Sequence, residues 1–245
     1  MELLTNIRSL PIVQKIWELR RRVFIVVITW VVFLLAGWGL SDHLMDFVER
    51  PLNGVTKLYF DTLTAPFITH FKVSAYAAVF FTIPMAFLQL WLFIRKEIGL
   101  KVKSFILPFL LLSYPLFAGG AIFCYLVPFP LAVDFLVNFD PAIKPSLRVD
   151  DFLSFALRLL IVFGLIFEMP LVSLLLTRIG ILTPGFLTRN RSYAIVVLFM
   201  VAAVLAPPDV LSMIMLAVPL LALYEVSIIV CRLAQPRRPK DPAGP

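Results

Sequence analysis

The sequence predicts an all-α protein whose six helices span a lipid bilayer. Of its 245 residues, 61% are hydrophobic and only 15% are charged, whereas soluble domains carry about 25% charged residues. Six apolar runs approach the roughly 20 residues that one membrane-spanning helix needs, and short polar connections separate them. A water-soluble fold cannot bury so much apolar surface. One membrane domain is therefore expected to occupy residues 1–232.

The apolar runs give the expected spans in order along the chain. The basic triplet at 20–22 precedes an uncharged run that is too long for a cleaved signal peptide, so we expect an uncleaved first span. The third run is too long for one span, and Pro128 and Pro130 indicate that its helix ends near Val127. A disordered cytoplasmic tail is expected at 233–245, which is rich in proline and charge. The expected spans are residues 23–40, 72–94, 104–127, 154–177, 192–206 and 210–231.

The distribution of positive charge predicts the orientation. With a cytoplasmic N-terminus, the connections on the cytoplasmic side hold sixteen Lys and Arg residues, and the external loops hold four. Positive charge is retained on the cytoplasmic side, so both termini are expected there. The net charge of +7 indicates contact with lipid headgroups and not with nucleic acid, because the basic residues stand at the ends of apolar runs. No transit peptide is visible, which favours a bacterial plasma membrane.

The connections between the spans carry further predictions. Apolar residues in both longer external loops favour short amphipathic helices on the outer interface. We expect each of the last two spans to have about 15 residues and to reach about 22 Å, less than the roughly 30 Å of hydrocarbon. Such a short hairpin favours docking of a partner. Between these spans, Pro207 and Pro208 predict a stiff turn, and Asp209 before an apolar run predicts a helix N-cap.

Two acidic residues interrupt the expected spans. A carboxylate at the depth of Glu168 is costly, so we expect it to face a cavity, a partner or water, or to be protonated. Alternatively, a protonated Glu168 hydrogen-bonds a neighbouring helix for packing alone, with the Ile166 carbonyl, freed by Pro170, as one acceptor. Glu225 lies nearer the cytoplasmic end, where it either serves a polar site or reaches interfacial water or Arg232.

Glu18 stands immediately before the first span, next to the basic triplet. One interpretation is a salt-bridged acidic residue on a basic helix. The other is a carboxylate that binds a basic peptide, because arginine pairs with carboxylates through two parallel hydrogen bonds. Common enzyme signatures are missing, and the only histidines, His43 and His70, lie in the first external loop. We therefore expect no enzyme activity, no catalytic residue, no metal site and no cofactor.

A series of short motifs runs along the chain in a characteristic order, from about residue 14 to residue 232. On these motifs the chain resembles TatC, the large subunit of the twin-arginine protein translocase. The motifs are Glu18-Leu19-Arg20-x-Arg22, Pro51-Leu52, Asp61 with Pro66-Phe67, Gln89-x-Trp91-x-Phe93-Ile94, Phe129-Pro130-Leu131-Ala132, Phe152-Leu153-Ser154-Phe155, Phe163-Gly164, Phe167-Glu168-x-Pro170, Gly180-Ile181, Arg191-x-Tyr193, Pro207-Pro208-Asp209 and Glu225.

The resemblance implies a fold and a function. The fold is a cupped-hand bundle of six helices, and the function is that of core and signal-peptide receptor of the translocase. Such a protein exports folded cargo that carries a twin-arginine signal peptide, driven by the proton gradient. The implied partners are TatA and TatB type single-span subunits beside the last two helices, the signal peptides of cargo, and further copies of the chain in a larger complex.

The resemblance also implies roles for individual residues. Glu18 would pair with a signal-peptide arginine, and Arg20, Arg22 and Phe93 would shape the surface around it. Glu168 and Glu225 would form intramembrane polar sites for a translocase helix or for the inserted signal. The implied structural residues are Pro51 and Asp61 in the external cap, Asp209 in the last hairpin, and Pro66, Gln89, Pro170, Pro207 and Pro208.

The first cytoplasmic loop departs from the family pattern. Family members usually carry a second acidic residue there, but the matching position falls on Val102 or Ser104, and the loop is basic. Glu97 is the candidate substitute for signal binding.

Two other interpretations stay open. One is that the chain is a TatC-like paralogue that has lost cargo recognition. The other is that it is a proton-coupled small-molecule transporter with Glu168 as the titrating group. Such transporters often contain paired repeats of similar hydropathy. The first three and last three spans of this chain differ in length and in loop pattern.

Overall fold

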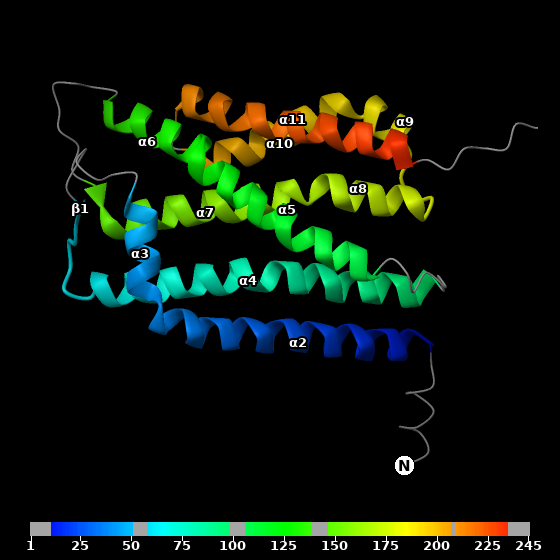
Figure 1. The fold of residues 1–245 in the computed structure, drawn as a ribbon, viewed down its shortest axis with the longest axis horizontal. Coiled ribbons are helices and arrows are strands. Elements are labelled where there is room, and N and C mark those ends of the chain that lie inside the picture. Colours follow the sequence, from blue (N-terminus) through cyan, green and yellow to red (C-terminus); the bar gives the residue numbers. More distant parts are fainter. Residues whose placement is uncertain (1–10, 51–57, 99–105, 139–146, 207–208, 235–245) are drawn as a thin grey trace, which may run out of the picture. The chain divides into compact units, whose positions relative to one another are not determined.

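The structure, a computed structural model, describes residues 11–50, 58–98, 106–138, 147–206 and 209–234. These residues are almost entirely helical (Figure 1). Two two-residue strands, β1 (Leu58–Tyr59) and β2 (Leu147–Arg148), pair in parallel. The helices are α2 (Pro11–Gly39), α3 (Ser41–Glu49), α4 (Ala65–Ile98), α5 (Ile106–Leu126), α6 (Pro128–Asn138), α7 (Val149–Phe167), α8 (Met169–Arg178), α9 (Pro184–Arg189), α10 (Arg191–Leu205) and α11 (Val210–Ala234).

Most of the helical length is apolar enough to cross a membrane. Within the part of the chain that the structure describes, five segments reach spanning length, and α10 is a sixth apolar helix of 15 residues. The predicted all-α, multi-span membrane fold is confirmed. The five long segments are Trp17–Gly39, Ala65–Phe93, Leu111–Asn138, Val149–Arg178 and Val210–Ala234.

Three helices differ from the sequence prediction. Helix α4 begins at Ala65, before the expected start at residue 72, so an apolar part of the connection expected to precede this span is helical. The expected fourth helix is divided at Glu168, because Pro170 has no N–H to continue the ladder of backbone hydrogen bonds. The last span was expected to be short, and that was wrong: α11 has 25 residues, or about 37 Å. Only α10 is short.

The chain forms two compact units by its internal contacts. The first contains Met1–Pro115 and Leu136–Ile161, and the second contains Leu116–Phe135 and Val162–Pro245. Both units are built almost entirely of helices in the residues that the structure describes, so each buries its core by packing helix against helix.

In the first unit, α2 packs along α4 (Figure 1). A Cβ atom added at Gly37 would lie 3.4 Å from the Ser74 carbonyl oxygen, so the two helices approach closely at this glycine. The rings of Phe33 and Phe81 stack with their centroids 5.5 Å apart. Close approach and ring packing along much of their length hold α2 and α4 side by side.

Ion pairs join the segment around Asp61, the start of α7 and Lys72 of α4 in the first unit. The Arg148 guanidinium lies 3.1 Å from a carboxylate oxygen of Asp61 and 3.4 Å from one of Asp150. The Lys72 ammonium lies 3.2 Å from the other oxygen of Asp150. Tyr59 pairs with Arg148 in the two-stranded ladder. The segment around Asp61 is thereby tied to the start of α7.

In the second unit, α8 and α9 both pack on α11. The Thr177 hydroxyl donates to Cys231 Sγ at 3.0 Å, and both side chains are buried. The Tyr224 hydroxyl donates to the Leu187 carbonyl oxygen at 2.8 Å. Gly180 follows the end of α8 with a φ of 79°, a conformation that L side chains seldom adopt. It lets the chain turn from α8 towards α9.

Glycines also bring α5 and α7 together within the second unit. A Cβ atom added at Gly120 would lie 2.7 Å from Phe167 Cβ and 2.8 Å from the Phe163 carbonyl oxygen. One added at Gly164 would lie 2.7 Å from the Phe117 ring. At Gly120 the neighbours are backbone and the base of a side chain, so this position requires glycine, whereas at Gly164 the Phe117 ring would have to shift to admit a Cβ atom.

Candidate functional site

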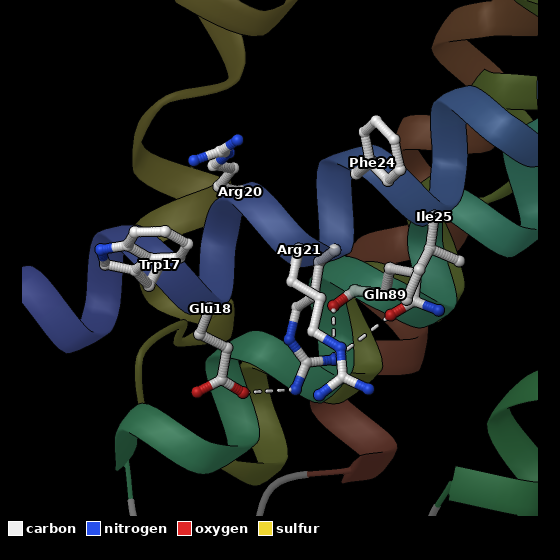
Figure 2. Close-up of a pocket in the computed structure, with 8 residues that line it drawn as sticks. Trp17, Glu18, Arg20, Arg21, Phe24, Ile25 and Gln89 are labelled. Carbon is white, nitrogen blue, oxygen red and sulfur yellow. Dashed lines mark hydrogen bonds and ion pairs between the residues drawn. The ribbon is translucent and has the colours of Figure 1, made fainter.

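A cavity of about 830 Å³ lies at the N-terminal end of the first spanning segment, between α2 and α4 (Figure 2). It combines the charged start of the segment with its first apolar turn. Eight residues line it: Trp17, Glu18, Arg20, Arg21, Arg22, Phe24 and Ile25 from α2, and Gln89 from α4.

The centre of this cavity is an arginine held by three oxygen atoms. Arg22 donates to Glu18 Oε1 at 2.7 Å, one helical turn earlier on α2. It also donates to Gln89 Oε1 at 3.3 Å and to the Gln89 carbonyl oxygen at 3.5 Å. The side chains of Arg22 and Glu18 are only 18% and 17% exposed. The interaction is therefore partly shielded from water, and it links α2 to α4.

The other two arginines of the cavity are exposed. The Arg20 guanidinium lies over the Trp17 ring, 5.0 Å from its centroid, a favourable cation–π arrangement. Arg21 lines the cavity, but among the described residues it is in no ion pair. Three arginines and one glutamate thus share this lining with the apolar side chains of Trp17, Phe24 and Ile25.

The structure gathers some of the predicted signal-binding residues and not others. Glu18, Arg20 and Arg22 line one cavity, and Gln89, predicted to be structural, lies there too. Phe93 is half-buried one helical turn beyond Gln89, outside the described lining. Glu97 belongs to α4. Its side chain and the loop with Val102 and Ser104 lie outside the described residues.

Some lining residues were not predicted from the sequence, namely Trp17, Arg21, Phe24 and Ile25. Their spacing of three, four and seven residues places them on adjoining faces of one helix. A helical projection of residues 17–25 would have grouped them around Glu18. The contribution of Gln89 depends on the packing of α4, so no local pattern indicates it.

Glu168 is enclosed within the second unit. Its relative exposure is 1%, and it occupies the single position between α7 and α8. Its N–H donates to the Leu165 carbonyl oxygen at 3.2 Å, and its own carbonyl oxygen accepts from Val172 N at 2.9 Å. Pro170, also buried, begins α8 beside it. The predicted intramembrane carboxylate is thus covered by the protein at a break in the helix.

Glu225 has a different neighbour from the one expected. Its Oε2 accepts from the Arg191 guanidinium at 2.7 Å, and both side chains are about half exposed. Arg232 was considered as its partner from the sequence. The pairing with Arg191 arises because α10 packs on α11, a tertiary contact that sequence distance does not reveal.

The predicted structural residues have local roles where they are described. Asp61 pairs with Arg148, and its carboxylate raises the pKa of that guanidinium. Asp209 Oδ1 accepts from Ser212 N at 2.6 Å, the geometry of an N-cap for α11. Pro66 lines a smaller cavity of about 350 Å³ between α3 and α4. Pro51, Pro207, Pro208 and the tail beyond residue 234 lie outside the described residues.

No group of three or more His, Cys, Asp or Glu side chains could hold a metal ion among the residues that the structure describes. The juxtamembrane cavity is instead suited to pairing a guanidinium with a carboxylate and amide oxygens. Charge-assisted hydrogen bonds of this kind are stronger than neutral ones.

Known proteins of one family are similar to this chain along nearly its whole length. A family model for the Sec-independent protein translocase protein TatC matches residues 14–219. TatC of Magnetococcus marinus is 35% identical over 241 residues, which cover 96% of this chain and 88% of that protein. TatCy of Bacillus subtilis is 33% identical over 243 residues, which cover 98% and 95%.

A solved structure gives the same result. The crystal structure of a twin-arginine translocase receptor, TatC, superimposes with a TM-score of 0.83 and 33% sequence identity. The match covers 90% of this chain and 99% of that one. Family model, relatives and fold agree: this chain belongs to the TatC family of Sec-independent protein translocase proteins.

Proposed function

We propose that this chain is the core and signal-receptor subunit of a twin-arginine translocase, in which Glu18 receives an arginine of the cargo's signal peptide. The proposal extends to this chain what the relatives' names state, a Sec-independent translocase protein and a twin-arginine translocase receptor. It assigns the chain binding and assembly, with no covalent chemistry of its own.

The observation that carries the proposal is the set of oxygen atoms around the Arg22 guanidinium. Glu18 Oε1, Gln89 Oε1 and the Gln89 carbonyl oxygen accept from one planar, forked donor group. Arginine matches such an arrangement, whereas lysine offers a compact point charge. A site built in this way would distinguish arginine from lysine in a cargo peptide.

The position of the cavity supports the same function. It lies at the start of the spanning segment Trp17–Gly39, and its wall continues into the apolar side chains of Phe24 and Ile25. A signal peptide has a basic region followed by an apolar one. The cavity offers an oxygen-rich end and an apolar end in that order.

We place this chain in a bacterial plasma membrane with both termini in the cytoplasm. The basis is the excess of Lys and Arg in alternate connections. In this orientation the cavity faces the compartment in which cargo is made. The ion pairs around Arg148 then lie at the opposite, external side of the membrane.

We also propose that single-span subunits of the TatA and TatB type, and further copies of this chain, complete the complex. Helix α10 exposes a series of large apolar side chains, as expected of a surface that contacts lipid or another helix. Glu168 and Glu225 would supply polar contacts to a helix of such a subunit. Glu168 is enclosed, so a partner would reach it only after the protein around it moves. Transport would be driven by the proton gradient, with no nucleotide.

Rescue of export in bacteria that lack their own large subunit tests the function. The chain is expressed with small subunits from the same source and a folded reporter that carries a twin-arginine signal. We expect the reporter to be exported, and export to fail when the two arginines are replaced by lysines.

Two outcomes would contradict the proposal. Absence of export despite normal accumulation of all subunits would favour a paralogue without cargo recognition. Equal export with the lysine signal would exclude arginine recognition at this site.

A further inference from the structure

Arg22 occupies the oxygen atoms that a cargo arginine would need. We propose that Arg22 is an internal occupant of the signal site, and that a cargo arginine binds by exchanging with it at Glu18. This inference rests on the proposed function and adds to it a residue that sets the threshold for binding.

Direct competition follows from the geometry. Arg22 takes Glu18 Oε1 at 2.7 Å, the shortest of its three contacts. An incoming guanidinium that pairs with both carboxylate oxygens must take Oε1 as well. Arg22 must therefore give up this contact before a forked pairing with cargo forms.

The exchange involves chemically equivalent partners. Cargo arginine and Arg22 both present a guanidinium, so bonds to Glu18 and Gln89 that are lost by one can be regained by the other. Arg22 is tethered one helical turn from Glu18, which gives it the high effective concentration of an intramolecular ligand. The apparent affinity for cargo is then the intrinsic affinity multiplied by the fraction of time in which Arg22 does not hold Glu18 Oε1.

Such an occupant would favour extended signals over isolated charges. A single basic residue from solution competes poorly with a tethered arginine. A signal with a second arginine and an adjoining apolar region has additional contacts available at Phe24 and Ile25, on the same cavity wall. These added contacts would shift the exchange towards cargo.

The adjacent residue provides a matched control. Arg21 lies next to Arg22 and lines the same cavity, yet it forms no ion pair among the described residues. The substitutions Arg21→Gln and Arg22→Gln remove the same charge from the same helix and the same cavity. Only Arg22→Gln removes the 2.7 Å contact between Arg22 and Glu18 Oε1.

The test is equilibrium binding of a fluorescent twin-arginine signal peptide to the full-length protein in nanodiscs, with a lysine-lysine peptide as the reference. Arg22→Gln is expected to bind the arginine peptide about threefold to tenfold more tightly than Arg21→Gln does, the range for a partly shielded ion pair. Arg22→Lys, which keeps the charge and loses the forked geometry, is expected to fall between wild type and Arg22→Gln. It also serves if Arg22→Gln does not fold.

The outcomes separate the two proposals. If the wild-type protein prefers the arginine peptide but Arg22→Gln binds it no more tightly than Arg21→Gln, then Arg22 is not an internal occupant, although the receptor function stands. If neither the wild type nor the Arg22 variants distinguish the arginine peptide from the lysine peptide, the receptor function itself is overturned.

Discussion

Two glutamates in this chain occupy contrasting surroundings. Glu18 lies in a cavity with its side chain 17% exposed, and its partner Arg22 is on the same helix. Glu168 is 1% exposed and occupies the break between α7 and α8. Both residues are glutamates, so the difference between them lies in their access to water. We expect the more exposed carboxylate to exchange partners and the enclosed one to keep its place between α7 and α8.

The physical reason is the cost of separating charges. Water and incoming groups can reach a partly exposed pair and stabilise its separated partners, so such a pair opens at a smaller cost than an enclosed one. A carboxyl group inside a protein at membrane depth has no such replacement, and its position is set by the helices around it. These surroundings support the proposed recognition role for the Glu18 region, and they lead us to expect that Glu168 contributes first to the geometry of the break between α7 and α8.

The largest expected effect tests the fixed character of the Glu168 region. Gly120→Ala would place a Cβ atom 2.7 Å from Phe167 and 2.8 Å from the Phe163 backbone. Neither α7 atom belongs to the flexible end of a side chain, so we expect a loss of about 3 kcal/mol in stability. Thermal unfolding in detergent measures it.

The neighbouring glycine is the control for this substitution. A Cβ atom at Gly119 would meet nothing within 4 Å, so Gly119→Ala should leave the midpoint unchanged or slightly raised. Equal midpoints for the two variants would show that α5 and α7 are not held as rigidly as their close approach indicates.

The next effect tests exchange at the other glutamate. Glu18→Gln removes the charge that holds a guanidinium, and we expect about thirtyfold weaker binding of a twin-arginine peptide, equivalent to about 2 kcal/mol. Glu49→Gln, at the end of α3 in the same unit, is the control and should bind normally. Unchanged binding by Glu18→Gln would refute recognition at this residue.

A smaller effect separates an architectural Glu168 from one that serves a partner. Glu168→Gln keeps the volume and a hydrogen-bonding group, and should fold normally. Glu168→Ala leaves a gap at a buried position and should lower stability by about 1–2 kcal/mol. If Glu168→Ala melts as the wild type does but loses crosslinks to a single-span subunit, the residue acts chiefly through its partner.

The smallest effect is expected at Glu225. Its pair with Arg191 is about half exposed, and exposed ion pairs contribute less than about 1 kcal/mol. Glu225→Gln should therefore change the unfolding midpoint little. A large shift in the midpoint would instead show that Glu225 is needed for the stability of the fold. A charge-swapped double variant at 191 and 225 would then show whether the ion pair itself causes the shift.

Much of the fold follows from local sequence patterns. The apolar runs predict helices because each must satisfy its own backbone hydrogen bonds in lipid. Asp209 before an apolar run predicts the N-cap that accepts from Ser212. Local patterns did not predict the start of α4 at Ala65, because that part of the loop gains its helical structure by continuing a helix already formed.

The candidate site was predictable in part. Glu18 and Arg22 are one helical turn apart on a predicted helix, so their pairing follows from sequence distance alone. Gln89 is 67 residues away from Arg22 and is brought there by the packing of α4 on α2. The Glu225 partner differed from the expected Arg232 for the same reason, since the packing of α10 on α11 brings Arg191 to it.

The sequence by itself determined that this chain crosses a membrane several times as helices, and that acidic residues stand at three notable positions. Hydrophobicity and helical spacing are properties of neighbouring residues, so they can be read without a structure. Only the tertiary structure decided which of these carboxylates is enclosed, which is paired on a surface, and which shares a cavity with arginines. Burial and partner choice depend on helices that are distant in sequence, because water is excluded only where they pack together.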